Sequence, residues 1–189
     1  MDLRDSIIQI DNLFNKELTK RIIGYLNSIK LDNLNTTAGK NLDIRNVKGK
    51  FLRTNDLLLK HNNPTDHVFS KLIEKEILKL LPIYRSKFPS LFSNRVTQID
   101  LLKYTVGGKY EIHTDYFLNS SRELTCIINL NEEYEGGELV FFNSFKKEEI
   151  LKPKLKKRSV IFFPSNFMYP HKINPLTKGK RYSIVSWIS

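Results

Sequence analysis

The sequence has almost no cysteine and no long apolar run. Cys126 is the only cysteine among 189 residues, so the chain can form no internal disulfide and lacks the cysteine pairs of zinc fingers. A reducing compartment is compatible with this composition. No apolar stretch approaches the roughly 20 residues of a membrane span, and the first residues contain no apolar block of the signal-peptide type. These absences favour a cytoplasmic protein with no membrane partner.

Acidic residues are few relative to basic ones. The chain has 31 Lys and Arg against 20 Asp and Glu, a formal net charge of +11. Such a charge attracts anionic partners such as nucleic acid, although the joint abundance of Lys, Asn and Ile also fits a composition bias with no partner. The densest basic run lacks the interleaved aromatic residues of a single-strand stacking platform. We interpret it as a solvated turn, formed by Lys152, Lys154, Lys156, Lys157 and Arg158.

The N-terminal half carries helical periodicity. Apolar residues recur at helical spacing within Asn12 to Lys30 and again after Pro64, which predicts two helices with one buried face each. Short strands are expected at Ser6 to Ile10 and at Phe51 to Leu59. The polar stretch from Asp32 to Lys50 has no periodicity of its own, and it is predicted as a loop.

From residue 96 onward the pattern changes to short β segments separated by turn residues. Gly107-Gly108 lies between two segments and predicts a two-residue hairpin turn, and Gly136-Gly137 supplies permissive backbone before another strand. We expect one α+β domain over residues 1–189, in which residues 1–95 form a helical support region and residues 96–189 form a double-stranded β-helix (jelly roll). The predicted strands are Val96 to Val106, Lys109 to His113, Arg122 to Leu130, Glu138 to Phe142, Ile150 to Leu151, Ser159 to Phe163 and Arg181 to Ile188.

Two histidines and one aspartate form the most informative pattern in the chain. Residues i and i+2 of an extended segment point to the same side, so His113 and Asp115 can reach one metal ion while Thr114 faces away. A third ligand must come from another strand, and closure of the sheet can bring His171 opposite the pair. Two imidazoles and one carboxylate are the protein ligands of facial non-haem Fe(II) sites, which leave the opposite face of the metal open.

Each part of this pattern also has a simpler explanation. A His-x-Asp sequence arises by chance in roughly one such chain in five, and a hydrogen bond between the two side chains would account for the pair. His171 could be a surface histidine after Pro170. Arg181 can bind a carboxylate through two parallel hydrogen bonds, and Ser183 lies on the same strand face. Their simpler explanation is an ordinary basic strand start with an exposed hydroxyl.

Taken together, these residues resemble the core of the 2-oxoglutarate- and Fe(II)-dependent dioxygenases, in particular the prolyl 4-hydroxylase-like branch. The run from Tyr104 to Asp115 is similar to the family's tyrosine, glycine turn, aromatic residue and His-x-Asp. The segment from Arg122 to Asn131 resembles the strand that follows, and Tyr134 to Phe141 resembles the Gly-Gly-Glu turn. The distal half of the family core is matched by Phe162-Phe163-Pro164, by His171 and by Gly179 to Trp187.

The resemblance implies a role for individual residues. His113, Asp115 and His171 would bind iron, and Arg181 would pair with the distal carboxylate of 2-oxoglutarate, so that these four form the implied catalytic set. Asn129 departs from the family, because some prolyl hydroxylases have a tyrosine there against the co-substrate. Further contacts to the co-substrate would come from Tyr104, Thr125 and Ser183.

The activity implied by the resemblance is hydroxylation of an unactivated carbon with Fe(II), 2-oxoglutarate and O2, with release of succinate and CO2. Ascorbate is a further expected cofactor. Asp115 favours hydroxylation over halogenation, because related halogenases lack this carboxylate. The expected substrate is a prolyl or other side chain of a protein or peptide. Small-molecule substrates stay open at this stage, as does the oligomeric state.

Two alternatives rest on the basic charge instead. The first is oxidative dealkylation of nucleic acid, which needs a flipped base held between aromatic or apolar walls. Nucleic-acid dealkylases carry a second arginine shortly after the one that matches Arg181, and no arginine follows it before Trp187. The second is a non-catalytic, basic nucleic-acid-binding β-barrel whose metal residues are incidental. The ordered set of motifs argues against it.

Overall fold

The computed structural model describes residues 2–34, 45–54, 63–116, 121–146 and 148–189. Its helices are the short 3-10 helix η1 (Leu3–Ser6), α1 (Lys16–Ser28) and α2 (Pro64–Arg85). The strands are β1 (Ile8–Ile10), β2 (Asp32–Asn33), β3 (Arg45–Asn46), β4 (Lys48–Arg53), β5 (Val96–Tyr104), β6 (Lys109–His113), β7 (Leu124–Asn129), β8 (Tyr134–Gly136), β9 (Leu139–Phe142), β10 (Glu149–Leu151), β11 (Val160–Pro164), β12 (His171–Ile173), β13 (Leu176–Gly179) and β14 (Arg181–Ile188).

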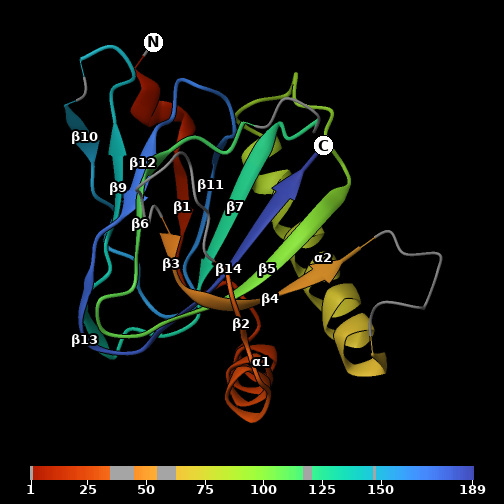
Figure 1. Cartoon of the computed structure of the whole chain (residues 1–189). Coiled ribbons are helices and arrows are strands. Elements are labelled where there is room, and N and C mark those ends of the chain that lie inside the picture. The colour runs from red at the N-terminus through yellow and green to blue at the C-terminus, as the bar shows by residue number, and fades with distance from the viewer. Residues whose placement is uncertain (1, 35–44, 55–62, 117–120, 147) are drawn as a thin grey trace.

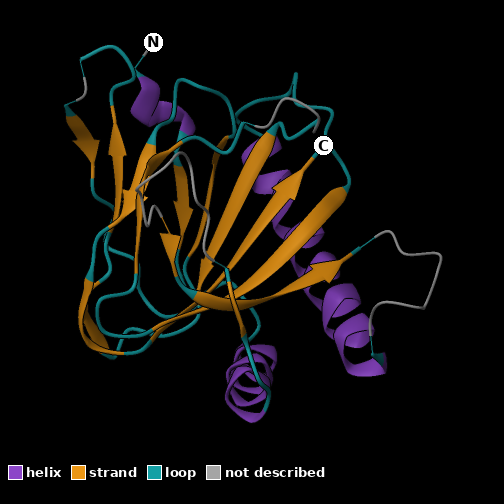
Figure 2. Cartoon of the chain, in the orientation of Figure 1, coloured by secondary structure: helices purple, strands orange, loops and turns teal. Residues whose placement is uncertain are grey.

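Most of the described strands form two antiparallel sheets, and helices α1 and α2 lie on the outer side of the larger one (Figure 1, Figure 2). The large sheet has the order β1-β11-β7-β14-β5-β4-β2, and the small sheet has the order β10-β9-β12-β6-β3. Strands β8 and β13 pair separately. Every strand pair within the described ranges is antiparallel. This arrangement is the predicted jelly roll with supporting helices.

The central strands of the large sheet, β5, β7, β11 and β14, are largely buried on both faces. The alternation of side chains along each strand divides their residues between two cores. On β5, Ile99 and Leu101 belong to the core under the helices, whereas Leu102 and Tyr104 belong to the core between the sheets. The outer core includes Phe14, Ile22, Leu26, Ile73, Ile77, Leu81 and Ile184. The inner core includes Ile127, Leu139, Phe141, Phe163 and Ile173. The helices therefore seal one face of the sheet and leave the other for a site.

Helix α2 begins at a well-defined N-terminal cap. The side chain of Asn63 accepts the backbone N–H of Asp66, and Pro64 occupies the first turn, where a missing N–H breaks no helical hydrogen bond. Tyr25 of α1 donates its hydroxyl to the Asp66 carboxylate and so joins the two helices. The predicted helix after Pro64 is confirmed. None of the described helices is long and apolar enough to cross a membrane.

The N-terminal predictions need several corrections. The helix expected over Asn12 to Lys30 starts at Lys16, and Ser6, expected in a strand, belongs to η1. The segment Asp32 to Lys50, expected as a loop, supplies β2, β3 and the start of β4 to the two sheets, although residues 35–44 lie outside the described residues. Two-residue strands have too few positions to show an alternating pattern. The region 1–95 thus supports the fold with strands as well as helices.

Strand β4 also differs from its prediction in position. It begins at Lys48, three residues before the expected strand start at Phe51, and ends at Arg53. The rest of the predicted segment, from residue 55 onward, lies outside the described residues. The strand predicted from Arg181 to Ile188 is confirmed as β14, whereas the short strands β8, β12 and β13 were not expected.

The prediction of a hairpin at Gly107-Gly108 is wrong. Strands β5 and β6 lie in different sheets, so this turn carries the chain from the large sheet to the small one. The Gly107 N–H donates to the carbonyl of Leu176 at 2.8 Å, and the Gly108 N–H donates to the carbonyl of Thr105 at 2.7 Å. The glycine pair signals a turn correctly, but it does not reveal that both edges of β5 are already occupied by β14 and β4.

Removing a side chain from the outer core should destabilise the fold without touching the inner cavity. Ile73 is fully buried between α2 and the large sheet, and we expect Ile73→Ala to lower the free energy of unfolding by about 2–5 kcal/mol. Denaturant unfolding followed by circular dichroism measures the change. The exposed Lys75 on the same helix is the control, and Lys75→Ala should change stability by less than about 0.5 kcal/mol. Equal effects of the two substitutions would contradict this packing.

Candidate metal centre

The pairing of β6 with β12 brings two histidines together. His113 is the last residue of β6, and its register partner is His171, the first residue of β12. Asp115 follows two residues later, with its Oδ1 3.7 Å from His113 Nε2 and its Oδ2 3.7 Å from His171 Nε2. The three ligand atoms all lie within 4.8 Å of one another. Three facial ligand atoms bound at about 2.0–2.2 Å lie roughly 3 Å apart, so a small inward movement of these side chains would complete a site for one ion.

Backbone carbonyls orient both imidazole rings. His113 Nδ1 lies 2.8 Å from the carbonyl oxygen of Glu111, and His171 Nδ1 lies 3.0 Å from that of Tyr169. Since a carbonyl can only accept, each Nδ1 carries the proton and donates it. Each Nε2 lies on the side of Asp115 and is left available to bind a metal. In metal-binding histidines, the ring nitrogen that does not bind the metal commonly donates a hydrogen bond to such a partner, which fixes the orientation of the ring.

The protonation of the cluster also suits a metal. Burial and the neighbouring His171 lower the pKa of His113 to about 3, so this ring is neutral at physiological pH. Burial alone would raise the pKa of Asp115, but His171, His113 and the hydrogen bond from Thr125 outweigh it and hold the pKa below its usual value. A neutral imidazole and an ionised carboxylate are the ligating forms of these groups.

Thr125 holds the carboxylate ligand in place. Its Oγ1 donates to Asp115 Oδ2 at 2.7 Å and lies 2.8 Å from Ser165 Oγ, and all three residues are buried. Thr125 does not contribute to the lining of the cavity described below. The structure therefore places it behind the metal ligand, where it orients the carboxylate.

A cavity of about 240 Å³ opens beside the three ligands. Two neighbouring strands of the large sheet line it with adjacent rows of side chains, because every second residue points inward. Strand β5 contributes Gln98, Asp100, Leu102 and Tyr104, and strand β14 contributes Arg181, Ser183, Val185 and Trp187. The register pairs Tyr104 with Arg181 at one end and Gln98 with Trp187 at the other.

Arg181 is a buried cation at the Tyr104 end of this cavity. Its guanidinium carbon lies 5.1 Å from the centre of the Tyr104 ring, and its Nη1 donates to Ser183 Oγ at 3.3 Å. No hydrogen-bond partner for its Nε or Nη2 occurs among the described residues, and none of their carboxylates forms an ion pair with it. An unpaired buried charge costs several kcal/mol. The two nitrogens are therefore suited to a carboxylate ligand, which a guanidinium binds through both oxygens.

Gly137 makes room for the stem of Arg181. A Cβ at this position would lie 3.2 Å from Arg181 Cδ and 2.9 Å from a methyl group of Leu176. Gly137 also has a φ of +67°, a backbone conformation that favours glycine. The glycine at this turn is thus required both by the backbone and by the close passage of the arginine.

These residues fit a divalent ion and a dicarboxylate. Two imidazole nitrogens and one carboxylate leave positions open on a metal such as Fe(II). The unbonded nitrogens of Arg181 supply the distal anchor for a second carboxylate in the same cavity.

Of the other predicted residues, Tyr104 and Ser183 line the cavity next to Arg181. Asn129 is absent from the lining and accepts a hydrogen bond from the Tyr134 hydroxyl at 3.1 Å.

Sequence reasoning missed four lining residues at the other end of the cavity. Arg45 comes from the segment predicted as a loop and lies 3.6 Å from the Asp100 carboxylate. The guanidinium carbon of Arg122 lies 3.8 Å from the centre of the Trp187 ring. The alternation along β5 and β14 could have placed Asp100 and Trp187 on the face of Tyr104 and Arg181. The position of Arg45 had no comparable signal.

Removal of the Thr125 hydroxyl should weaken metal binding. In Thr125→Val the Asp115 carboxylate loses its buried donor, and we expect metal affinity to fall by about 10- to 100-fold, as for other residues that orient metal ligands. Anaerobic titration with Fe(II) measures the dissociation constant. Thr125→Ser keeps the hydroxyl and should recover most of the affinity. A valine variant that binds Fe(II) as tightly as the unmodified protein would rule out this role.

A methyl group at Gly137 should displace Arg181 and leave the metal ligands in place. We expect Gly137→Ala to raise the KM for 2-oxoglutarate by about tenfold or more, since loss of an orienting charge-assisted hydrogen bond costs about 1.5–3 kcal/mol, with little change in Fe(II) affinity. Gly24→Ala is the matched control, because nothing lies within 4 Å of the added methyl group on α1. An unchanged KM in a folded Gly137→Ala protein would contradict the steric argument.

Comparison with known proteins agrees with this geometry. The family model described as the 2OG-Fe(II) oxygenase superfamily matches residues 99–189. A PKHD-type hydroxylase of Alteromonas mediterranea is 32% identical over 129 residues, which are 67% of this chain and 49% of that protein. PKHD-type hydroxylase PiuC of Pseudomonas aeruginosa is 28% identical over 152 residues, covering 68% of this chain and 60% of that protein. The chain thus spans about half to three fifths of the length of these relatives.

Two solved structures share the fold. A prolyl hydroxylase from Trichoplax adhaerens, in complex with a hypoxia inducible factor oxygen degradation domain peptide fragment, has a TM-score of 0.74 at 16% identity, over 97% of this chain and 83% of that one. A Pseudomonas putida prolyl-4-hydroxylase has a TM-score of 0.70 at 16% identity, over 97% of this chain and 91% of that one. Residues 99–189 match the model of the 2OG-Fe(II) oxygenase superfamily, and the chain shares the fold of these prolyl hydroxylases.

Proposed function

We propose that this protein is an Fe(II)- and 2-oxoglutarate-dependent dioxygenase that hydroxylates an unactivated carbon. The observation that carries the proposal is the position of Arg181, whose buried guanidinium has two unbonded nitrogens in the cavity that the metal ligands line. A metal site alone would fit many enzymes. A metal site and an unpaired arginine in one cavity fit a co-substrate with a carboxylate at each end.

In this reaction the residues of the chain would bind and orient the iron and the co-substrate. His113, Asp115 and His171 would hold Fe(II), and Arg181 would bind the distal carboxylate of 2-oxoglutarate, with Tyr104 under the guanidinium. When bound, iron and 2-oxoglutarate supply the reductive activation of O2. One oxygen atom then enters succinate as CO2 is lost, and the other enters the substrate C–H bond as a hydroxyl. The four electrons that O2 accepts come in equal parts from the co-substrate and the substrate.

The proposed substrate is a side chain of a protein or peptide, with proline as the first candidate. Support comes from the names of the relatives, which are PKHD-type hydroxylases, and from the prolyl hydroxylases that share the fold. We also propose a cytoplasmic location, because a chain with one buried cysteine suits the reducing compartment that keeps iron ferrous. Ascorbate, as a reductant of the iron, belongs to the same proposal.

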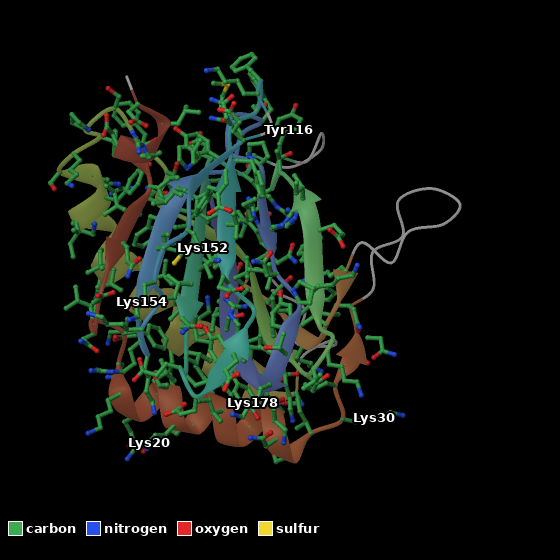
Figure 3. All side chains as sticks on the ribbon, turned by 90° about the vertical axis from the view of Figure 1, so that its left-hand side faces the viewer. Lys20, Lys30, Tyr116, Lys152, Lys154 and Lys178 are labelled. Atoms are coloured by element: carbon green, nitrogen blue, oxygen red, sulfur yellow. The ribbon has the colours of Figure 1, made fainter. Side chains whose placement is uncertain are left out.

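The nucleic-acid alternatives receive little support from the surface. In the basic run, Lys156 pairs with Asp11 at 3.2 Å and Lys157 pairs with Glu133 at 3.3 Å. Of the exposed lysines labelled in Figure 3, Lys20, Lys30 and Lys178 lie apart from Lys152 and Lys154 of the basic run. Basic charge that is paired or dispersed fits a solvated surface better than a phosphate-binding track.

Binding of the co-substrate tests the proposal directly. Anaerobic addition of Fe(II) and 2-oxoglutarate should produce the weak visible charge-transfer band of the chelate. Arg181→Lys should raise the dissociation constant for 2-oxoglutarate by about tenfold or more, because a point charge replaces a two-pronged donor. Arg21→Lys, at an exposed position on α1, is the matched control and should bind normally. A folded, iron-loaded protein that shows no band would refute the proposal.

Turnover identifies the substrate class. Succinate formation should rise above the uncoupled background with one group of compounds in a panel of proline-rich peptides, free amino acids and methylated oligonucleotides. Asp115→Ala serves as the blank, since loss of the carboxylate ligand should abolish iron-dependent turnover. Stimulation by oligonucleotides alone would replace the peptide proposal with the dealkylase alternative.

A further inference from the structure

The end of the cavity away from Arg181 contains three buried polar atoms without hydrogen-bond partners. They are Oδ2 of Asp100, Nε of Arg45 and Nε1 of Trp187, each unpartnered among the described residues. All three residues line the cavity and are 1%, 8% and 6% exposed, respectively. Leaving such an atom unsatisfied costs about 1–3 kcal/mol. Three of them in one place indicate that a ligand completes this end of the cavity.

This group of atoms is separate from the anchor for the co-substrate. Asp100 is the register partner of Val185, four residues beyond Arg181 on β14. At a rise of about 3.3 Å per residue, the two positions are about 13 Å apart along the strand. Trp187 lies a further two residues along. A dicarboxylate bound at Arg181 therefore leaves Asp100, Arg45 and Trp187 for a second molecule, the substrate.

Neighbouring residues hold the three side chains in position. Asp100 Oδ1 accepts from Gln98 Nε2 at 2.7 Å, and Gln98 Oε1 accepts from Arg122 Nη2 at 3.1 Å. Arg122 in turn stacks on the ring of Trp187. The other oxygen of Asp100 lies 3.6 Å from Arg45 Nη2, an ion pair too long for a hydrogen bond. The unpartnered atoms thus belong to a built network with fixed directions.

The chemistry of the network defines what it can bind. It offers one carboxylate acceptor and two N–H donors, so the complementary group has an N–H beside an acceptor. Two guanidinium groups, on Arg45 and Arg122, lie near Asp100. The other carboxylate near Arg122, that of Asp115, belongs to the candidate metal site, so a negatively charged acceptor is favoured here. Burial raises the pKa of Asp100 to about 6, against the Gln98 hydrogen bond and Arg45, which lower it. Asp100 is therefore mostly ionised at neutral pH and can accept from an ammonium or amide.

We propose that this end of the cavity binds an α-amino acid unit with a free carboxylate. The α-nitrogen donates to Asp100 Oδ2, and the carboxylate accepts from Arg45 Nε and Trp187 Nε1. This inference rests on the proposed hydroxylase activity and changes its substrate class from any protein or peptide side chain to a residue with a free carboxylate. A free amino acid and the C-terminal residue of a peptide share this chemistry, whereas an internal residue of a peptide lacks the free carboxylate.

Changes in the ligand test the proposal on the unmodified protein. Calorimetry under anaerobic conditions, with Fe(II) and 2-oxoglutarate bound, compares free L-amino acids with their carboxamides, beginning with L-proline. Tripeptides carrying the same residue at the C-terminus or in the middle form the second arm. We expect at least one free acid or C-terminal residue to bind at least tenfold more tightly than its carboxamide or internal counterpart. Equal binding of the acid and the carboxamide would overturn the proposal.

A substitution tests the role of Asp100. Asp100→Asn keeps the shape of the side chain and removes the charge, and we expect the dissociation constant of the best ligand to rise at least tenfold. Asp32→Asn changes an exposed carboxylate on β2 and is the control. Only preparations that show the charge-transfer band enter the comparison. If Asp100→Asn fails to fold, the comparison of free amino acids with their carboxamides on the unmodified protein still tests the proposal.

The outcomes separate this inference from the proposed function. An unmodified protein with no charge-transfer band refutes the proposed function, and the inference falls with it. A protein that shows the band but binds none of the amino acids or C-terminal peptides overturns the inference alone. In that case the three polar atoms are satisfied by water only, and the proposed function stands.

Discussion

Burial of polar groups in one cavity is the constraint on which the rest of the structure depends. Three candidate metal ligands and a guanidinium lie between two sheets, where water can satisfy few of them. Such groups are stable only when the protein fixes their directions and a ligand completes their bonds. Here Thr125, the carbonyls of Glu111 and Tyr169, and the space left by Gly137 provide those directions. The site is thus a property of the two facing sheets more than of any single motif.

The outer helices help to position the buried polar groups, although they do not line the cavity. Strand β5 carries Leu101 toward the helices and Tyr104 toward the cavity, so packing on one face fixes the position of side chains on the other. A sheet with one face in water would be held by packing on one face only. The backbone pairing of β5 with β14 sets the register of the two rows, and that register determines how far apart the two ends of the cavity lie.

The parts of the site that the sequence predicted are those with a local signal. The i, i+2 spacing placed His113 and Asp115 on one side of a strand, and eight residues from Arg181 onward had enough length to reveal β14. His171 could be assigned only through family resemblance, because β12 has three residues. Arg45 was missed altogether. Its two-residue strand has no periodicity, and its place in the cavity depends on pairing with β6, which local sequence does not reveal.

The turn at Gly107-Gly108, where the chain crosses from one sheet to the other, affects how the chain must fold to form the site. Because β5 and β6 separate there into different sheets, each must find partners far along the chain, β14 for one and β12 for the other. Folding that depends on such non-local pairing is slow compared with hairpin formation. We therefore expect the three candidate ligands to converge late in folding, and an ion that binds only the folded state would shift the folding equilibrium toward it by mass action.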